Sequence, residues 1–264
     1  MKIIISPAKK MNVREDELDW ANLPCFLDKA EELKQYIQGL SREEARQLWA
    51  CNETIADLNY SRFQEMDLTS RLTAALLAYE GIQYQYMAPG IFEKSQWDYV
   101  QEHLRILSGF YGILRPLDGI VPYRLEMQAK VALPTGVRGL YDYWGKEIYE
   151  ELIRESDVII NLASKEYSKA VEPYLTPDIT WITCVFGMVE PDKEGRERMK
   201  IKATEAKMAR GEMVRFLSEN QIGDIRKIKE FCGLGYEYSQ ERSGSREYVF
   251  LKSKGERERR CISP

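Results

Sequence analysis

Two short, almost wholly apolar runs constrain the fold of this chain more than any other feature. Lys2–Ser6 and Asp157–Ala163 have the length and composition of strands buried on both faces. Each run leads directly into polar residues, Ser6-Pro7-Ala8-Lys9-Lys10 after the first and Ser164-Lys165-Glu166-Tyr167 after the second. If the two strands lie side by side in one parallel sheet, Lys9 and Lys165 emerge at the edge where α/β proteins place ligand groups. The alternative is a solvated turn after each strand.

The remaining segments predict a mixed α/β fold. We expect one compact domain over residues 1–254, with a central sheet that contains parallel strands, flanking helices and a C-terminal hairpin. Residues 255–264, where Arg and Glu dominate, are expected to be a disordered tail. The spacing of apolar residues and the turn signals predict helices over Pro24–Gly39, Ser41–Ala50, Thr69–Tyr79, Ser95–Leu107, Gly139–Arg154 and Ala203–Glu219, strands over Ile179–Val189 and Arg198–Lys202, and a hairpin of Gly235–Ser239 and Arg246–Lys252.

Composition excludes several classes of function. His103 is the only histidine, which rules out multi-histidine metal sites and argues against a histidine-based catalytic triad. The net charge of −4 argues against a protein that coats nucleic acid over its whole surface, but it allows a local basic cleft. No apolar run approaches a membrane span, and the five scattered cysteines suit a reducing cytoplasm. We therefore expect a cytoplasmic protein with no metal, no cofactor and no membrane partner.

The segment Leu104–Met127 is predicted to form the wall of a site. It begins as a helix, breaks at two glycines, and then carries four charged side chains among Leu, Ile and Tyr residues. Charges in apolar surroundings are costly unless they are paired or used, and the glycines indicate tight turns or close backbone approach. A salt-bridged structural loop is the alternative. The four charged residues are Arg115, Asp118, Arg124 and Glu126.

The helix Ala203–Glu219 is the basic element of an acidic protein. Arg210 falls at the margin of its apolar face, and Lys207 and Arg215 lie further round. A glycine inside a helix costs on the order of 1 kcal/mol relative to alanine, so Gly211 indicates that something approaches this face closely. An arginine at such a margin is suited to bind phosphate or carboxylate, although a solvated charged face would show the same pattern.

Four segments together resemble the YaaA / DUF328 (UPF0246) family in order and spacing. They are Ile5-Ser6-Pro7-Ala8-Lys9, Leu104–Met127, Asn161-Leu162-Ala163-Ser164-Lys165-Glu166-Tyr167 and Lys207-Met208-Ala209-Arg210-Gly211. The resemblance implies a cytoplasmic bacterial protein linked to peroxide stress and to limiting damage from free iron. It also implies a compact mixed α/β fold with a positively charged cleft that binds DNA.

The resemblance further implies a helix-hairpin-helix-like element. The candidate is the helix ending at Leu107 with the turn Ser108–Gly112. The turn of a helix-hairpin-helix normally offers Gly-x-Gly, whose backbone N–H groups meet phosphate. Here Gly109-Phe110-Tyr111-Gly112 is one residue longer, and Pro116 interrupts any second helix. The residues alone do not predict this motif.

Two functions remain open. The first is a stress-response protein that binds duplex or distorted DNA through a basic cleft, largely independently of sequence, because the basic side chains suit phosphates and no helix is placed to read base edges. Tyr111, Tyr123 or Tyr167 would stack on an unpaired base. The residues expected to hold phosphates are Lys9, Arg115, Arg124, Lys207, Arg210 and Arg215.

The alternative is an enzyme that acts on a nucleotide or a damaged base, of the N-glycosidase or lyase type. Lys9 or Lys165 would be the amine nucleophile, Glu126 or Asp118 the acid or base, and Asn161 would orient the substrate. Direct binding of iron is disfavoured, because imidazole and soft ligands are nearly absent.

Overall fold

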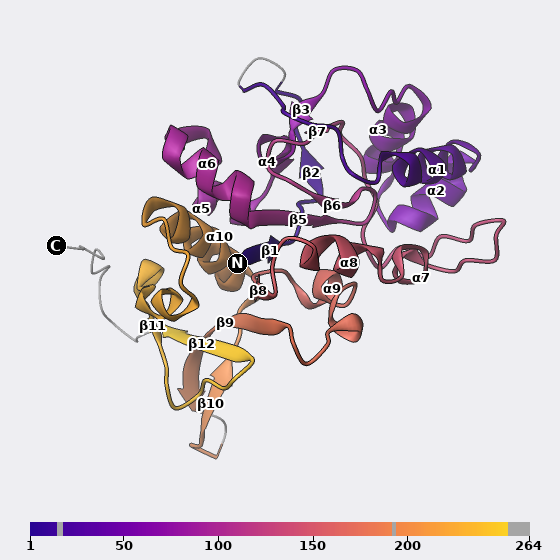
Figure 1. The fold of residues 1–264 in the computed structure, drawn as a ribbon. Coiled ribbons are helices and arrows are strands. Elements are labelled where there is room, and N and C mark those ends of the chain that lie inside the picture. Colours follow the sequence, from indigo (N-terminus) through magenta and orange to yellow (C-terminus); the bar gives the residue numbers. More distant parts are fainter. Residues whose placement is uncertain (15–17, 192–193, 253–264) are drawn as a thin grey trace.

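Strand β1 (Lys2–Ile5) lies near the middle of an eight-stranded sheet (Figure 1). The computed structural model describes residues 1–264 except 15–17, 192–193 and 253–264, so the predicted tail falls outside the described residues. The order of the strands is β11-β12-β9-β8-β1-β5-β6, and β10 pairs with β9. Their bounds are β5 (Leu104–Ser108), β6 (Gly112–Leu114), β8 (Val158–Asn161), β9 (Thr180–Pro191), β10 (Glu197–Lys200), β11 (Tyr236–Tyr238) and β12 (Glu247–Lys252).

The centre of the sheet is parallel and its edges are antiparallel. β1 pairs in parallel with β5 and β8, β8 with β9, and β9 with β12. β6, β10 and β11 each join as antiparallel partners. All four residues of β1 are buried, which explains the apolar run of three isoleucines after Lys2, because a parallel strand is covered on both faces. The two apolar strands that the sequence singled out are therefore neighbours in the sheet, which the sequence had left open, and the predicted C-terminal hairpin is confirmed.

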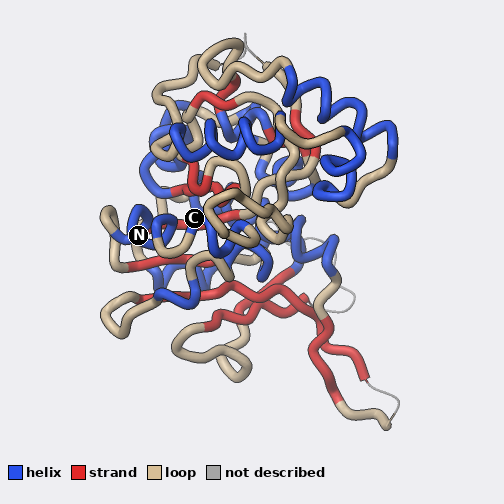
Figure 2. The backbone as a smooth tube through the Cα atoms, turned by 90° about the vertical axis from the view of Figure 1, so that its right-hand side faces the viewer, coloured by secondary structure: helices blue, strands red, loops and turns tan. Residues whose placement is uncertain are grey.

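Helices cover both faces of this sheet. Figure 1 shows α5, α6 and α10 on one side of the central strands and α8 on the other. In Figure 2, β9 and β10 extend past the rest of the sheet as a two-stranded arm. The helices are α1 (Leu27–Gln38), α2 (Arg42–Trp49), α3 (Glu53–Gln64), α4 (Ala75–Ala78), α5 (Ile82–Met87), α6 (Lys94–His103), α7 (Leu140–Trp144), α8 (Glu147–Ile153), α9 (Lys165–Ser168) and α10 (Ala203–Glu219). Short elements complete the fold: β2 (Lys10–Met11) with β4 (Tyr79–Glu80), β3 (Thr73–Ala74) with β7 (Gly119–Ile120), and 3₁₀ turns at Pro89–Ile91, Glu172–Tyr174, Ile225–Glu230 and Gly233–Gly235. None of the described helices combines the length and the apolar character that crossing a membrane requires.

Helix α10 packs against α5 at unusually close range. A Cβ atom on Gly211 would lie 2.1 Å from the carbonyl oxygen of Gln83 and 3.0 Å from the backbone nitrogen of Met87. No side chain fits between these two backbones, so glycine is required at this crossing. The expectation that something approaches this face closely is confirmed, and the partner is the backbone of α5.

The predicted helix through Leu107 is wrong. α6 ends at His103, and Leu104–Ser108 is strand β5, which pairs with β1 in the register Ile3↔Leu104. A short apolar run does not distinguish a buried strand from a buried helix, and pairing with β1 decides the outcome. Of the residues assigned to the helix-hairpin-helix-like element, those up to His103 lie in α6, and the remainder from Leu104 form the β5–β6 hairpin.

Two other predicted helices differ from the structure. Thr69–Tyr79 contains only the four-residue α4 between short strands. Gly139–Arg154 is divided into α7 and α8 at Gly145, whose φ of 47° does not continue a right-handed helix. Helix α3 was not predicted. The capping box of Ser41 and Glu44 is confirmed at the start of α2.

The turn between β5 and β6 is built around Ser108 and Gly109. The Ser108 hydroxyl is fully buried and accepts hydrogen bonds from the backbone N–H groups of Phe110 and Tyr111. A Cβ on Gly109 would lie 2.5 Å from the carbonyl oxygen of Leu125. This close contact holds the extended segment 121–126 against the hairpin, as the glycines of this stretch predicted.

Candidate functional site

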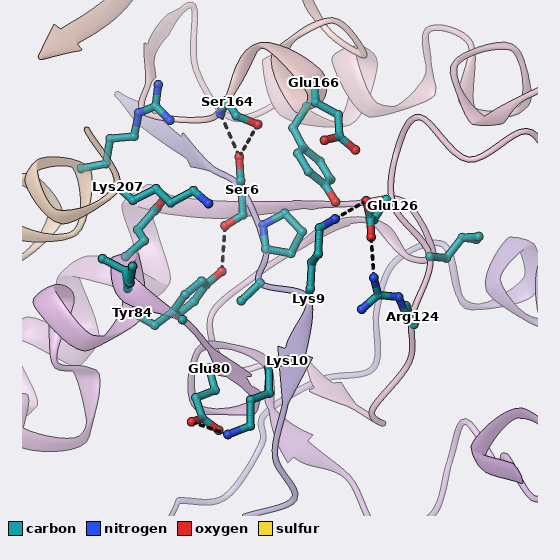
Figure 3. A pocket seen from close by; sticks show the side chains of 18 of the residues that line it. Ser6, Lys9, Lys10, Glu80, Tyr84, Arg124, Glu126, Ser164, Glu166 and Lys207 are labelled. Atoms are coloured by element: carbon teal, nitrogen blue, oxygen red, sulfur yellow. Dashed lines mark hydrogen bonds and ion pairs between the residues drawn. The ribbon is translucent and has the colours of Figure 1, made fainter. Parts of the chain in front are cut away.

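A pocket of about 430 Å³ lies beyond the carboxyl ends of β1 and β8 (Figure 3). Five segments line it: residues 6–10 after β1, 80–84 at the start of α5, 123–126 after β7, positions 164, 166 and 167 after β8, and positions 207 and 210 on α10. The volume falls in the range of small-molecule sites, roughly 300–1,000 Å³. Five basic side chains and three carboxylates lie in its wall: Lys9, Lys10, Arg124, Lys207, Arg210, Glu80, Glu126 and Glu166.

The two strand ends meet through their serines. The Ser6 hydroxyl accepts a hydrogen bond from the backbone N–H of Ser164 at 2.8 Å and lies 3.2 Å from the Ser164 hydroxyl oxygen. The Tyr84 hydroxyl donates to the carbonyl oxygen of Ser6 at 3.0 Å, which ties α5 to the same point. The ends of β1 and β8, whose meeting the sequence left open, therefore come together at this pocket.

Lys9 and Arg124 both hold the carboxylate of Glu126. The Lys9 ammonium lies 2.7 Å from Glu126 Oε2, and Arg124 Nη2 lies 3.2 Å from Glu126 Oε1. Lys9 remains 64% exposed, whereas the other two side chains are largely buried. The ion pair between Lys9 and Glu126 joins the chain after β1 to the segment after β7. It places an amine and a carboxylate together at the pocket mouth.

Glu166 is a second carboxylate in the pocket, and its pKa is raised. Burial of the side chain is the main cause, and the negative charge of Glu126 adds to it. The Lys9 ammonium and hydrogen bonds from the backbone of Gln128 and Met127 act in the opposite direction. A carboxyl group whose pKa is raised by burial is a candidate for acid–base chemistry.

Lys207 and Arg210 form the opposite, cationic end of the pocket. They lie three residues apart on α10 and therefore on one face of that helix. Among the described residues neither has a carboxylate partner, and the buried Nε of Arg210 has no hydrogen-bond partner. Burial also lowers the pKa of the Arg210 guanidinium. Figure 3 shows Lys207 pointing toward Ser6, across the pocket from Glu126.

Aromatic side chains form the wall between these two ends. Tyr84, Tyr123 and Tyr167 line the pocket and are all buried. The Tyr123 hydroxyl lies 2.6 Å from that of Ser108 and 2.8 Å from that of Tyr79, so its position is fixed by two hydrogen bonds. Burial raises the pKa of Tyr123 to about 12, which keeps this phenol neutral.

Some of the residues predicted for catalysis do not reach this pocket. Lys165 is exposed and does not line it, although Glu166 and Tyr167 beside it do. Asn161 is buried in β8, where its side chain donates to Thr183 Oγ1 at 3.2 Å and accepts from the backbone N–H of Ala163 at 2.9 Å. Its hydrogen bonds hold the end of the strand.

The other predicted charges lie elsewhere. Arg115 pairs with Glu155 at 2.8 Å beside a different cavity, and Asp118 accepts a hydrogen bond from the Arg115 backbone N–H at 2.8 Å. Arg215 pairs with Glu219 at 2.7 Å on α10. Tyr111 is fully buried. The segment 104–127 thus contributes Tyr123, Arg124, Leu125 and Glu126 to the pocket, while its earlier charges form a structural loop.

The sequence analysis missed two contributors to the site. Glu166 belongs to the polar segment that follows the second apolar strand, so its place in the sequence already indicated a site residue. The prediction named its neighbour Lys165 as the site residue instead. The segment 80–84 carried no signal of its own, because its approach depends on the close packing of α5 on α10. Within the described residues, no group of three or more His, Cys, Asp or Glu side chains is placed to hold a metal ion.

The sequence of this chain is similar to those of known bacterial proteins. Residues 1–242 match the family profile described as "Peroxide stress protein YaaA". The chain is 53% identical over 257 residues to a UPF0246 protein of Desulfitobacterium hafniense, which covers 97% of this chain and 100% of that protein. It is 52% identical over 250 residues to a UPF0246 protein of Agathobacter rectalis, covering 95% of this chain and 98% of the relative.

Proposed function

The chain belongs to the YaaA (UPF0246) family of peroxide stress proteins, and from this premise we propose that it acts by binding DNA through the basic pocket. The phosphates would meet the exposed amines at the mouth, on Lys9, Lys10 and Lys207, with Arg210 behind them. A pocket of about 430 Å³ does not admit a duplex, so the duplex would lie across the mouth. The protein would limit peroxide and iron damage at the DNA that it covers.

The observation that carries this proposal is the excess of positive charge at one place on an acidic chain. Five basic side chains against three carboxylates surround the pocket, although the chain has a net charge of −4. Such a local patch attracts a polyanion while the rest of the surface repels it. Phosphate contacts of this kind carry no sequence information, so the expected binding is largely independent of sequence.

The salt dependence of binding tests the proposal. The Kd of the full chain for a short duplex is measured by fluorescence anisotropy over a series of salt concentrations. Loss of one phosphate contact in Lys207→Ala is expected to weaken binding and to reduce the log–log slope by about 0.9. Lys227→Ala, which removes an exposed lysine outside the pocket, is the matched control and should change neither quantity. Unchanged binding by Lys207→Ala, or equal effects of the two substitutions, would contradict the proposal.

A second candidate function is a lyase that acts on abasic DNA. It is favoured by the contact of 2.7 Å between the Lys9 ammonium and Glu126. In its neutral form the Lys9 amine would attack the aldehyde carbon of the opened deoxyribose, and loss of water would give an imine. Glu126 would then accept the proton from C2′ while the bond between C3′ and its oxygen breaks and the 3′-phosphate leaves.

Reductive trapping distinguishes this enzyme from a binding protein. Borohydride is expected to trap a covalent adduct between the parent protein and abasic DNA. Lys9→Ala should form none, and Lys165→Ala should form as much as the parent, because Lys165 lies outside the pocket. If intact abasic DNA is recovered from the parent protein without an adduct, the lyase candidate fails and the binding function is unaffected.

A further inference from the structure

Arg210 has an unusual environment for a charged side chain. Its Nε is buried without a hydrogen-bond partner, and among the described residues no carboxylate forms an ion pair with it. The residue as a whole is of intermediate exposure. A charged group that is partly removed from water and has no counter-charge is costly, and an anionic ligand would offset that cost. The position of Arg210 in the wall of the pocket indicates that this ligand enters the pocket.

The surroundings of Arg210 supply further donors for an anion. Lys207 lies one helical turn away on the same face of α10 and has no ion pair among the described residues. The hydroxyls of Ser6 and Ser164 share one hydrogen bond, which uses one of their two protons and leaves the other without an acceptor in the described structure. An ammonium, a guanidinium and a hydroxyl that converge in this way match the oxygens of a phosphate monoester.

The other cations of the pocket lie beside carboxylates. Lys9 and Arg124 share Glu126, and Lys10 lies 2.7 Å from Glu80 Oε1. The pocket cations that have no ion pair among the described residues are thus at the α10 end, and the carboxylates of Glu126 and Glu166 lie at the far end (Figure 3). A ligand that spans this pocket has an anion at one end and hydrogen-bond donors at the other.

We propose that the pocket binds a single nucleoside monophosphate unit, with its phosphate on Lys207, Arg210 and the serine pair and an amino-bearing base toward Glu126 and Glu166. The choice of a nucleotide rests on the proposed DNA-binding function. The volume of about 430 Å³ suits one such unit, and Tyr84, Tyr123 and Tyr167 belong to the wall of the pocket. The exocyclic amino groups of adenine, guanine and cytosine are donors that thymine lacks.

Calorimetric titration of the full-length protein with deoxynucleoside 5′-monophosphates tests this inference. dAMP, dGMP and dCMP are expected to bind at least tenfold more tightly than dTMP, and each at least tenfold more tightly than its nucleoside. Inorganic phosphate should compete more weakly than these monophosphates, which separates a nucleotide site from a general anion site. Equal affinity for nucleotide and nucleoside, or competition by phosphate as strong as that by nucleotides, overturns the proposal.

Arg210→Met separates a ligand-binding role from a structural one. Removing a charged side chain whose Nε is buried without a partner is expected to raise the melting temperature of the ligand-free protein while abolishing nucleotide binding. Arg215→Gln, on the same helix but outside the pocket, should leave nucleotide affinity unchanged. A lower melting temperature for Arg210→Met would assign Arg210 to the structure and overturn the subsite.

Separate measurements of duplex binding keep the two proposals apart. Nucleotide binding without any affinity for duplex DNA would support the subsite and contradict the proposed function. Duplex binding without affinity for any monophosphate would overturn the subsite and leave the proposed function standing.

Discussion

The Lys9 ammonium lies 2.7 Å from Glu126 Oε2, although 117 residues separate the two in sequence. The contact joins the end of the central strand to the segment that Gly109 holds in place. Both charges also act on the carboxyl of Glu166: the negative charge of Glu126 raises its pKa, and the positive charge of Lys9 lowers it.

Replacing Glu126 is expected to lower the pKa of Glu166. The negative charge of Glu126 contributes to the raised pKa, and Glu126→Gln removes it while Lys9 remains. Carbon-detected NMR titration of the glutamate carboxyls measures the change. Glu80→Gln, in the same pocket but paired with Lys10, should leave the Glu166 pKa unaltered. A pKa that stays constant or rises in Glu126→Gln would show that Glu126 does not act on Glu166.

Asp118 makes the stability of the fold depend on pH. The side chain is 3% exposed, and burial raises its pKa to about 7. The unfolded chain releases this proton near its ordinary pKa of about 3.9, so the folded state holds it more tightly. The free energy of unfolding therefore falls as pH rises from about 4 to about 7, by roughly 4 kcal/mol at most.

Urea unfolding at several pH values checks the role of Asp118. Asp118→Asn carries no titrating group and should show a flatter dependence of stability on pH in this window. If the parent and Asp118→Asn lose stability in parallel as pH rises, the effect belongs to another group.

Gly211→Ala should destabilise the protein because the backbone of α5 occupies the space that the added methyl group needs. The new Cβ would lie 2.1 Å from the Gln83 carbonyl oxygen, and overpacking of this kind costs about 1–3 kcal/mol or more. Because Arg210 precedes this residue, binding should weaken as well. Gly223→Ala is the control, since no atom lies within 4 Å of its added Cβ. Equal melting temperatures for the two variants would refute the close crossing.

Ser108→Ala should also unfold at lower denaturant concentration. It leaves the backbone N–H groups of Phe110 and Tyr111 without their acceptor in a buried turn, and each unsatisfied group costs about 1–3 kcal/mol. Ser95→Ala, at an exposed position on α6, should be close to neutral. A stable Ser108→Ala would mean that the turn finds another acceptor.

Local sequence patterns predicted those helix caps, strands and turns whose structure depends on residues close together in the chain. The apolar strands β1 and β8, the capping box of Ser41 and the terminal hairpin follow from residues that are neighbours in sequence. Strand β5 was not predictable in this way, because its conformation depends on pairing with β1 more than 100 residues away in sequence. In the sequence alone, an apolar run that follows a helix fits the helical spacing. Only the strand that pairs with it identifies it as a strand.

The same limit applies to the site. Six basic residues were expected in one cleft, and four of them, Lys9, Arg124, Lys207 and Arg210, line the pocket, whereas Arg115 and Arg215 do not. Glu166 lines it in place of Lys165, because the short helix α9 turns one residue toward the pocket and its neighbour toward solvent. Residue type and spacing identified the segments, and the direction of each side chain needed the fold.

The position of β1 has a consequence for the order in which this protein matures on the ribosome. The first strand to be synthesised is flanked by β5 and β8, so it waits for more than 100 residues of chain before it gains a partner. Such non-local pairing is slow to form. The pocket is completed later still, because Lys207 and Arg210 are synthesised after all of its other lining residues. A prematurely terminated chain that lacks α10 would carry the carboxylates without these two cations, so the pocket proposed here would have the opposite balance of charge in such a chain.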